Sequence, residues 1–218
     1  MTKAIRCMSV LTALFTLCLQ LSAQSPTSDS LPDSPGRLAQ TSANSSGRPA
    51  GSTYQFPSGR RQFGNYVFSV LGPPGIISAA IGAEFDQRKP EPDEWDSGAG
   101  GYGERFGSRY GMRLVSQSTA YTLGAALHED VTYHRCECKG FVHRTTHAFT
   151  STVTARTRSG GTRLSVPLIV SPYVGSFTAV YGWYPDHYGA SDAARLGSTS
   201  VLFRGVGNLV GEFLAPAR

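Results

Sequence analysis

The sequence predicts a mainly α-helical domain of about four to six helices, either compact or membrane-associated, behind a disordered N-terminal linker. Between residues 102 and 130, aromatic and aliphatic side chains recur three and four residues apart, for example at Phe106, Tyr110 and Leu114. This is the spacing of one helix face. Residues 190–214 repeat it and show no two-residue alternation. The tyrosines, threonines and glycines leave a β-rich barrel as the alternative fold, although barrel strands require such alternation.

Residues 1–23 have the three parts of a cleavable secretory signal peptide. Lys3 and Arg6 give a positive start, residues 10–19 are mostly apolar, and Ala23 offers a small residue at the cleavage position. The apolar core is shorter than the roughly 20 residues that a membrane-spanning helix needs. We therefore expect an exported protein of the periplasm or of a cell-envelope membrane.

Residues 24–59 are rich in serine, proline and glycine and have no aromatic residue before Tyr54. Such a segment buries too little apolar surface to offset the entropy of ordering. It predicts a disordered linker, followed by a folded domain over residues 60–218. Loss of Lys3 and Arg6 with the signal lowers the formal net charge from +5 to about +3. This mild excess suits anionic lipid or an envelope polymer and gives no reason to expect a nucleic-acid partner.

The domain is predicted to consist of helices and loops in a simple order. Residues 65–83 are uncharged and predict two short helices separated at Pro73 and Pro74. The acidic residues 84–96 predict a loop. Residues 164–185 carry no charge; their length permits a membrane span, and a broken, buried core segment fits equally. The remaining elements are a long helix over 102–130, a helix with a strand-like composition towards its end over 141–156, and a last helix over 190–214.

Gly103, Gly107 and Gly111 lie four residues apart on one face of the long predicted helix. Glycine costs a helix about 0.8–1.0 kcal/mol relative to alanine. Three on one face therefore indicate the close approach of another backbone, as between helices in lipid. Gly207 and Gly211 repeat the spacing in the last helix. The opposing interpretation is a glycine-rich loop that continues from residue 98.

Arg105, Arg109 and Arg113 run beside this glycine face, also four residues apart. Like charges at this spacing repel, so we expect the three side chains to meet anionic groups such as phosphates, lipid headgroups or carboxylates. Arg204 and Glu212 stand on one face of the last helix, which predicts that Glu212 pairs with one of the three arginines. A solvated basic face is the alternative.

His128, Glu129 and Asp130 are weak candidates for an acid–base site at the end of the long helix. Three consecutive side chains of a helix cannot all point the same way, so capping of the helix end is the competing role. Thr132 stands where a zinc-protease motif needs histidine. The sequence has no recognised motif for a serine nucleophile or a phosphate-binding loop, and we predict no catalytic residue.

Cys136, Cys138, His143 and His147 form the one ligand-like cluster in the sequence. His143 and His147 are one helical turn apart, and two thiolates with two imidazoles suit tetrahedral zinc or copper. A Cys136–Cys138 disulfide is the alternative in an oxidising compartment. We expect no cofactor, with zinc or copper as the minority reading of this cluster.

Several short segments carry a family resemblance: Glu94-Trp95, Gly101-Tyr102-Gly103, Gly107-Ser108, His128-Glu129-Asp130 and Trp183-Tyr184-Pro185-Asp186. Over residues 60–214 they resemble a group of uncharacterised, signal-bearing envelope proteins of environmental bacteria, which implies an exported bacterial protein and no mechanism. The function we expect is that of a non-enzymatic cell-envelope protein. Its glycine-faced helices would pack together or on a membrane, and its arginines would meet anionic groups. The alternative is a periplasmic metal-binding protein or hydrolase that uses the region from His128 to His147.

Overall fold

The computed structural model describes residues 54–214, which form a mainly helical domain with a small antiparallel sheet. This confirms the predicted fold class over the β-rich barrel. The predicted signal peptide (1–23) and residues 24–53 of the predicted linker lie outside the described residues. The elements are α2 (Gly59–Leu71), α3 (Pro73–Arg88), α4 (Ala99–Leu127), β1 (Glu129–Asp130), α5 (Phe141–Thr150), β2 (Thr154–Thr157), β3 (Thr162–Leu164), α6 (Val166–Gly182) and α7 (Ala190–Leu214).

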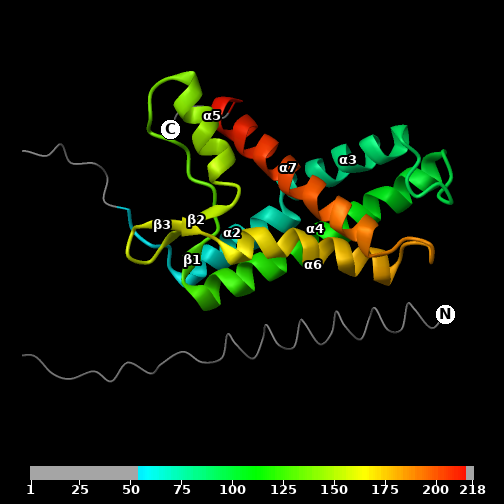
Figure 1. The fold of residues 1–218 in the computed structure, drawn as a ribbon, viewed down its shortest axis with the longest axis horizontal. Coiled ribbons are helices and arrows are strands. Elements are labelled where there is room, and N and C mark those ends of the chain that lie inside the picture. The colour runs from blue at the N-terminus through cyan, green and yellow to red at the C-terminus, as the bar shows by residue number, and fades with distance from the viewer. Residues whose placement is uncertain (1–53, 215–218) are drawn as a thin grey trace, which may run out of the picture.

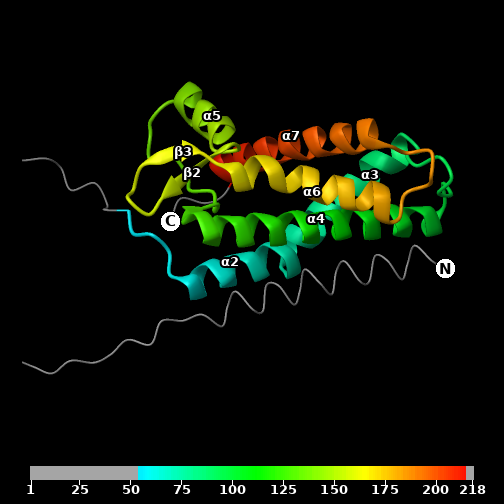
Figure 2. The same cartoon turned by 60° about the horizontal axis from the view of Figure 1, so that its bottom comes forward.

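The long helices run back and forth along one axis, as Figures 1 and 2 show. Helices α2 and α3 run out, α4 returns beside them, α6 runs out again on α4, and α7 returns on α6. Helix α5 packs against the last turns of α7. The sheet has the order β1-β2-β3, with Glu129 opposite Thr157 and Ala155 opposite Arg163. We call residues 54–61 and 128–165 the basic end of the bundle, and residues 84–98 and 183–195 the acidic end.

Two prolines separate α2 from α3, as predicted, and side chains of α4 replace the backbone donors that they lack. Pro73 and Pro74 have no N–H, so the carbonyls of Ser69 and Val70, four residues earlier, lose their helical partners. Arg113 donates from Nε and Nη2 to the Ser69 carbonyl at 3.1 and 3.0 Å. A tyrosine hydroxyl from the same helix donates to the Val70 carbonyl at 3.2 Å. The break in the chain is therefore fastened to α4.

Helix α6 contains a proline, and a side chain of a neighbouring helix again replaces the missing backbone donor. Pro172 removes the donor that the Leu168 carbonyl would receive in a regular helix. Arg204 of α7 replaces it, with Nη1 2.6 Å from the Leu168 carbonyl and Nη2 3.4 Å from the Ser171 hydroxyl. As a result α6 is continuous from Val166 to Gly182. Of the two interpretations left open for residues 164–185, the one with a broken segment is therefore wrong about the break. The segment forms a helix packed between α4 and α7.

Small residues let these helices approach closely. A Cβ atom on Gly175 of α6 would lie 2.6 Å from the carbonyl oxygen of Met112 and closer still to the Ser116 hydroxyl. On α7, a Cβ on Gly197 would lie 3.0 Å from the Ser176 hydroxyl. The main apolar core lies towards the acidic end and consists of Met112, Ala179, Val180, Tyr184, Ala193 and Leu196. The interior is thus narrow and built largely from alanine, glycine and serine.

Three predicted helices end at other residues than expected. Helix α4 ends at Leu127, because His128 takes a left-handed conformation (φ 54°), and Glu129 and Asp130 form a strand. Helix α5 ends at Thr150, and residues 154–157 form strand β2. The end of the predicted helix over 141–156, whose composition fitted helix and strand equally, is therefore a strand. Helix α3 includes the first five residues of the acidic segment that we predicted as loop and ends at Arg88.

Candidate functional site

Exposed apolar side chains cover the outer faces of α2, α3, α6 and α7. Phe85 of α3 and Phe203 of α7 join two parts of this surface, because their ring centroids lie 5.6 Å apart. Apolar patches larger than a few hundred Å² usually mark contact with another protein or with a membrane. We call the following side chains the apolar belt: Phe63, Phe68, Leu71, Ile76, Ile77, Ile81, Phe85, Val166, Val170, Phe177, Tyr181, Leu202, Phe203, Val206, Val210, Phe213 and Leu214.

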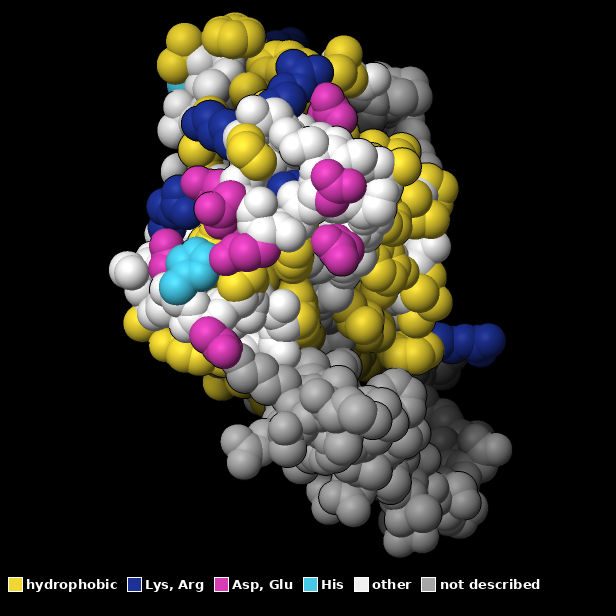
Figure 3. Space-filling model, turned by 90° about the vertical axis from the view of Figure 1, so that its right-hand side faces the viewer, with side chains coloured by type: hydrophobic (Ala, Val, Ile, Leu, Met, Phe, Trp, Pro, Cys, Tyr) yellow, Lys and Arg dark blue, Asp and Glu magenta, His cyan; other side chains and the backbone are white. Residues whose placement is uncertain are grey.

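Charged side chains lie at the two ends of the bundle or point into it. Residues 62–83, 114–127 and 164–185 contain no Asp, Glu, Lys or Arg. Beyond Arg195, the charged residues of α7 are Arg204 and Glu212, which bind α6 and α5 respectively. Figure 3 looks onto the acidic end and shows Asp and Glu side chains gathered beside a strip of hydrophobic ones. The described residues therefore place charge inside and at the ends, and apolar groups around the middle.

The arginines of α4 point inward, where each has a different role. Arg105 is fully buried and donates to three carbonyls of the acidic-end loop, at residues 92, 95 and 96, over 2.8–2.9 Å. Arg109 forms a two-pronged pair with Asp86 of α3, in which Nε lies 2.5 Å from Oδ2. Arg113 binds the Ser69 carbonyl. All three arginines were expected to meet anionic groups. Arg109 meets a carboxylate, whereas the contacts of Arg105 and Arg113 described here are with backbone carbonyls.

Glu212 does not pair with any of these arginines, so that prediction is wrong. Its carboxylate is fully buried and accepts hydrogen bonds from Arg144 Nε at 2.9 Å, the Tyr133 hydroxyl at 2.5 Å and the Cys136 backbone N–H at 3.1 Å. Burial, with the hydrogen bond to Glu212 and its charge, raises the pKa of Tyr133 far above its usual value. The cluster fastens the end of α7 to α5 and to the loop before it.

The five predicted packing glycines are helical, which excludes the loop interpretation. Gly103, Gly107, Gly207 and Gly211 have open space where a Cβ would stand, with no neighbouring described atom within 4 Å. A Cβ on Gly111 would lie 3.4 Å from the Trp183 ring. Close packing at the four open glycines would thus need lipid or another chain, and it stays a prediction.

The predicted metal ligands do not come together as a set. Cys136 and Cys138 are joined in a disulfide, with their Cα atoms 5.1 Å apart. His143 is exposed, whereas the ring of His147 packs 5.9 Å from that of Tyr133. Among the described residues, ligand atoms within 4.8 Å of one another belong to Asp93, Glu94 and His187, which are all exposed at the acidic end.

The three candidate acid–base residues also separate. His128 is exposed at the end of α4, and Glu129 and Asp130 point to opposite sides because successive residues of a strand do so. Glu129 is buried and accepts from Arg163 Nε at 2.9 Å and from the Ser165 hydroxyl at 2.6 Å. The Glu129 charge is thus balanced by Arg163 of β3, and Ser165 supplies a second hydrogen bond to the carboxylate.

Asp130 holds the start of the described chain against the sheet. Its Oδ2 accepts from the Tyr54 hydroxyl and from His134 Nε2, both at 2.7 Å, and its Oδ1 accepts from the Thr132 N–H at 3.0 Å. Burial alone would raise the pKa of Asp130, but these hydrogen bonds and the charge of His134 outweigh it and hold the pKa below its usual value. The described domain therefore includes Tyr54, six residues earlier than the predicted start at residue 60.

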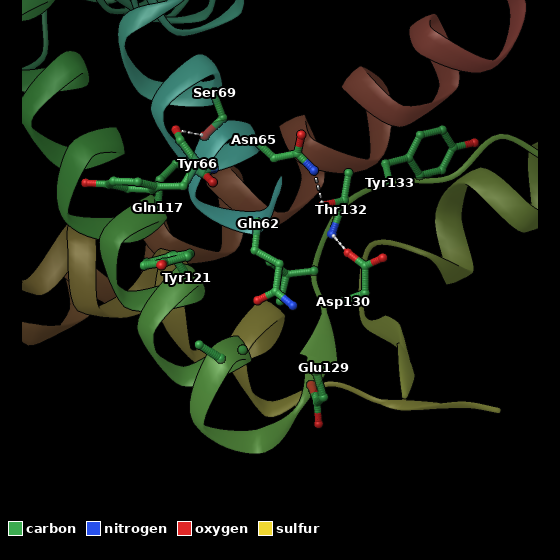
Figure 4. A pocket seen from close by; sticks show the side chains of 13 residues that line it. Gln62, Asn65, Tyr66, Ser69, Gln117, Tyr121, Glu129, Asp130, Thr132 and Tyr133 are labelled. Atoms are coloured by element: carbon green, nitrogen blue, oxygen red, sulfur yellow. Dashed lines mark hydrogen bonds between the residues drawn. The ribbon is translucent and has the colours of Figure 1, made fainter. Parts of the chain in front are cut away.

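A cavity of about 190 Å³ lies between α2, the end of α4 and residues 129–133. Figure 4 shows one side of it closed by Asn65, Thr132 and Asp130 in a row. Asn65 Nδ2 donates to the Thr132 hydroxyl at 3.3 Å. Gln62 and Gln117 also line the cavity, together with apolar groups such as Ala125 and Val131. Its wall is therefore mixed, with polar groups along one side.

No protein-family model matches the chain, and neither a curated protein nor a solved structure is significantly similar to it. The resemblance to envelope proteins of environmental bacteria therefore stays an expectation.

Sequence reasoning missed the residues that complete these clusters. Arg144 and Tyr54 stand 68 and 76 residues from the carboxylates that they bind, and no local pattern reports such a distance. The role of Arg204 and Arg113 had a usable signal. Each proline inside an apolar helical segment frees the carbonyl four residues earlier, and a buried donor on a neighbouring helix is then required.

Proposed function

We propose that this protein is a non-enzymatic component of the bacterial cell envelope whose helical bundle is held in a lipid membrane. The observation that carries the proposal is the distribution of side chains: aliphatic and aromatic groups face outward around the middle, while charged groups point inward or lie at the ends. Soluble helices normally show the reverse, with an apolar stripe towards the core and charges outside. The apolar belt would face the acyl chains.

The lengths of the helices support a position within the bilayer. Helix α7 has 25 residues, or about 37 Å at about 1.5 Å per residue, against a hydrocarbon core of about 30 Å. Residues 59–88, which form α2 and α3, contain an 18-residue window that is long and apolar enough to cross a membrane; the mean hydropathy of this window is 1.5, and 22% of it is buried within the domain. Most of this apolar stretch therefore faces outward.

The hydrogen bonds to the backbone carbonyls that proline leaves free also support a lipid environment. In lipid no water is present to bind a carbonyl freed by proline, so prolines are tolerated where neighbouring helices supply donors. Arg113 and Arg204 supply them for Ser69 and Leu168. The close contacts at Gly175 and Gly197 are the small-residue packing by which helices associate in membranes.

Membrane retention of the full chain tests the proposal. After expression in a bacterial host, we expect the protein to remain with the membranes after extraction at high pH with carbonate. Val206→Lys, in the apolar belt, should release much of it, because a lysine near the bilayer centre costs about 2.5–3.5 kcal/mol. Ser191→Lys, exposed on the same helix at the acidic end, is the matched control and should stay membrane-bound.

Circular dichroism in detergent should confirm that both variants remain helical. Complete release of the unaltered protein at low salt would overturn the proposal, and so would equal retention of folded Val206→Lys and Ser191→Lys. The metal-binding alternative is tested on the same preparation by metal analysis. The disulfide takes up both thiolates that this alternative needs.

A further inference from the structure

A second cavity lies among residues of α4, α6 and α7, beside the one in Figure 4. Its volume is about 140 Å³, against the roughly 10–15 Å³ that one water needs. Both cavities are lined by Gln117, Val131 and Tyr133, so the two lie next to each other. We call the smaller one the Arg204 cavity, after the one charged side chain among its described lining residues.

Among the described residues, no carboxylate forms an ion pair with Arg204. Its guanidinium donates to two neutral oxygens, those of Leu168 and Ser171. The positive charge of Arg204 is therefore not balanced by a described side chain that it contacts.

This arrangement is costly unless an anion joins it. Arginine stays protonated in proteins. Arg204 is half-buried, so its charge carries part of the desolvation cost of several kcal/mol that a fully buried ion without a partner would carry. Hydrogen bonds to carbonyls satisfy the N–H groups but leave the net charge. Gln117 lines the same cavity, and its amide makes no hydrogen bond to another described side chain or backbone group. The cavity is thus lined by a positively charged guanidinium and by an amide that has no other described partner.

We propose that the Arg204 cavity binds a small oxyanion of the phosphate or sulfate class, held by Arg204 and Gln117. Guanidinium groups bind such oxygens with short, charge-assisted hydrogen bonds. The site lies inside the bundle and does not depend on what the apolar belt contacts. This inference therefore goes beyond the proposed membrane function and stands or falls separately from it.

Thermal unfolding in lipid-free detergent provides the test, with inorganic phosphate as the probe. Sodium phosphate is raised while sodium chloride keeps the ionic strength constant. We expect the melting temperature to rise and saturate with phosphate, because a ligand that binds the folded state stabilises it by mass action. Arg88→Met, at an exposed position, should respond like the unaltered protein. The absence of lipid assigns any response to the free ion rather than to a headgroup.

Arg204→Met alone would confuse two roles, because it also leaves the Leu168 carbonyl without a donor. Pro172→Ala restores a backbone N–H for that carbonyl. We therefore compare Pro172→Ala, which should still bind phosphate, with Pro172→Ala/Arg204→Met, whose dissociation constant should rise about tenfold or more, the equivalent of about 1.4 kcal/mol. Gln117→Leu should weaken binding several-fold and does not disturb α6. The inference is overturned if the unaltered protein shows no saturable response, or if Gln117→Leu and the double variant respond as it does.

Discussion

Replacing Glu212 with glutamine should destabilise the protein strongly. The substitution keeps the shape of the side chain, but it removes the negative charge beside Arg144 and turns one acceptor into a donor that faces a hydroxyl and an N–H. Removal of one partner from a buried ion pair costs about 3–5 kcal/mol. The Arg144 side chain is 29% exposed, so water recovers part of that cost. We expect the free energy of unfolding to fall by about 3 kcal/mol, at the lower end of this range.

For a chain of this size, about 1 kcal/mol corresponds to about 2–4 °C in melting temperature. The expected decrease is therefore about 6–12 °C, measured by circular dichroism in detergent. Glu104→Gln, at an exposed position of α4, is the matched control and should change stability by less than about 0.5 kcal/mol. Adding Arg144→Met to Glu212→Gln should cost little more, because no uncompensated charge then remains. A Glu212→Gln protein that melts within 2 °C of the unaltered one would refute this account of the cluster.

Two further predictions concern the basic end and the glycines. Because the folded-state pKa of Asp130 is depressed below 3.8, its contribution is complete above that pH and is lost as the pH falls through the folded value. Asp130→Asn should therefore cost about 2 kcal/mol at neutral pH, and its difference from the unaltered protein in denaturant unfolding should shrink below about pH 4. Gly175→Ala should destabilise by about 1–3 kcal/mol through overpacking, whereas Gly103→Ala, in open space, should stabilise by up to about 1 kcal/mol.

Clear outcomes would contradict these two predictions. An Asp130→Asn difference that stays constant between neutral pH and the acid limit would show that the carboxylate is not held ionised by its neighbours. Equal effects of Gly175→Ala and Gly103→Ala on the melting temperature would show that the close approach of α6 to α4 is not built on Gly175. If Gly103→Ala is stable in detergent but is lost from membranes, the open glycine face makes the contact that the sequence predicted for it.

The fold class was accessible from the sequence because helical spacing is a local property. Phe106, Tyr110 and Leu114 needed no knowledge of the rest of the chain to predict α4, and Pro73 with Pro74 sufficed to place the break before α3. The end of α4 was misplaced by three residues. Nothing in the sequence around His128 announces a left-handed residue, since such a conformation is usually taken by glycine or asparagine.

The clusters could not be predicted, because they join residues that are distant in the chain. Spacing correctly placed Arg204 and Glu212 on one face of α7, but it could not show which helix that face meets. The arginines of α4 were equally ambiguous. An arginine that faces a proline break in a neighbouring helix donates to the free carbonyls there, as Arg113 does. The four-residue spacing of Arg105, Arg109 and Arg113 fits this role and an anion-binding site equally.

The course of the chain has a consequence for how the bundle would be oriented. Each outward helix is followed by a returning one, so α2 starts and α7 ends at the basic end (Figure 1). Tyr54 binds Asp130 at that end, and Leu214 is the last residue of α7. If the bundle crosses a bilayer, reporters fused near these two residues would sit in the same compartment, and the loop of residues 89–98 would open into the other. The two leaflets would thus meet surfaces of opposite sign.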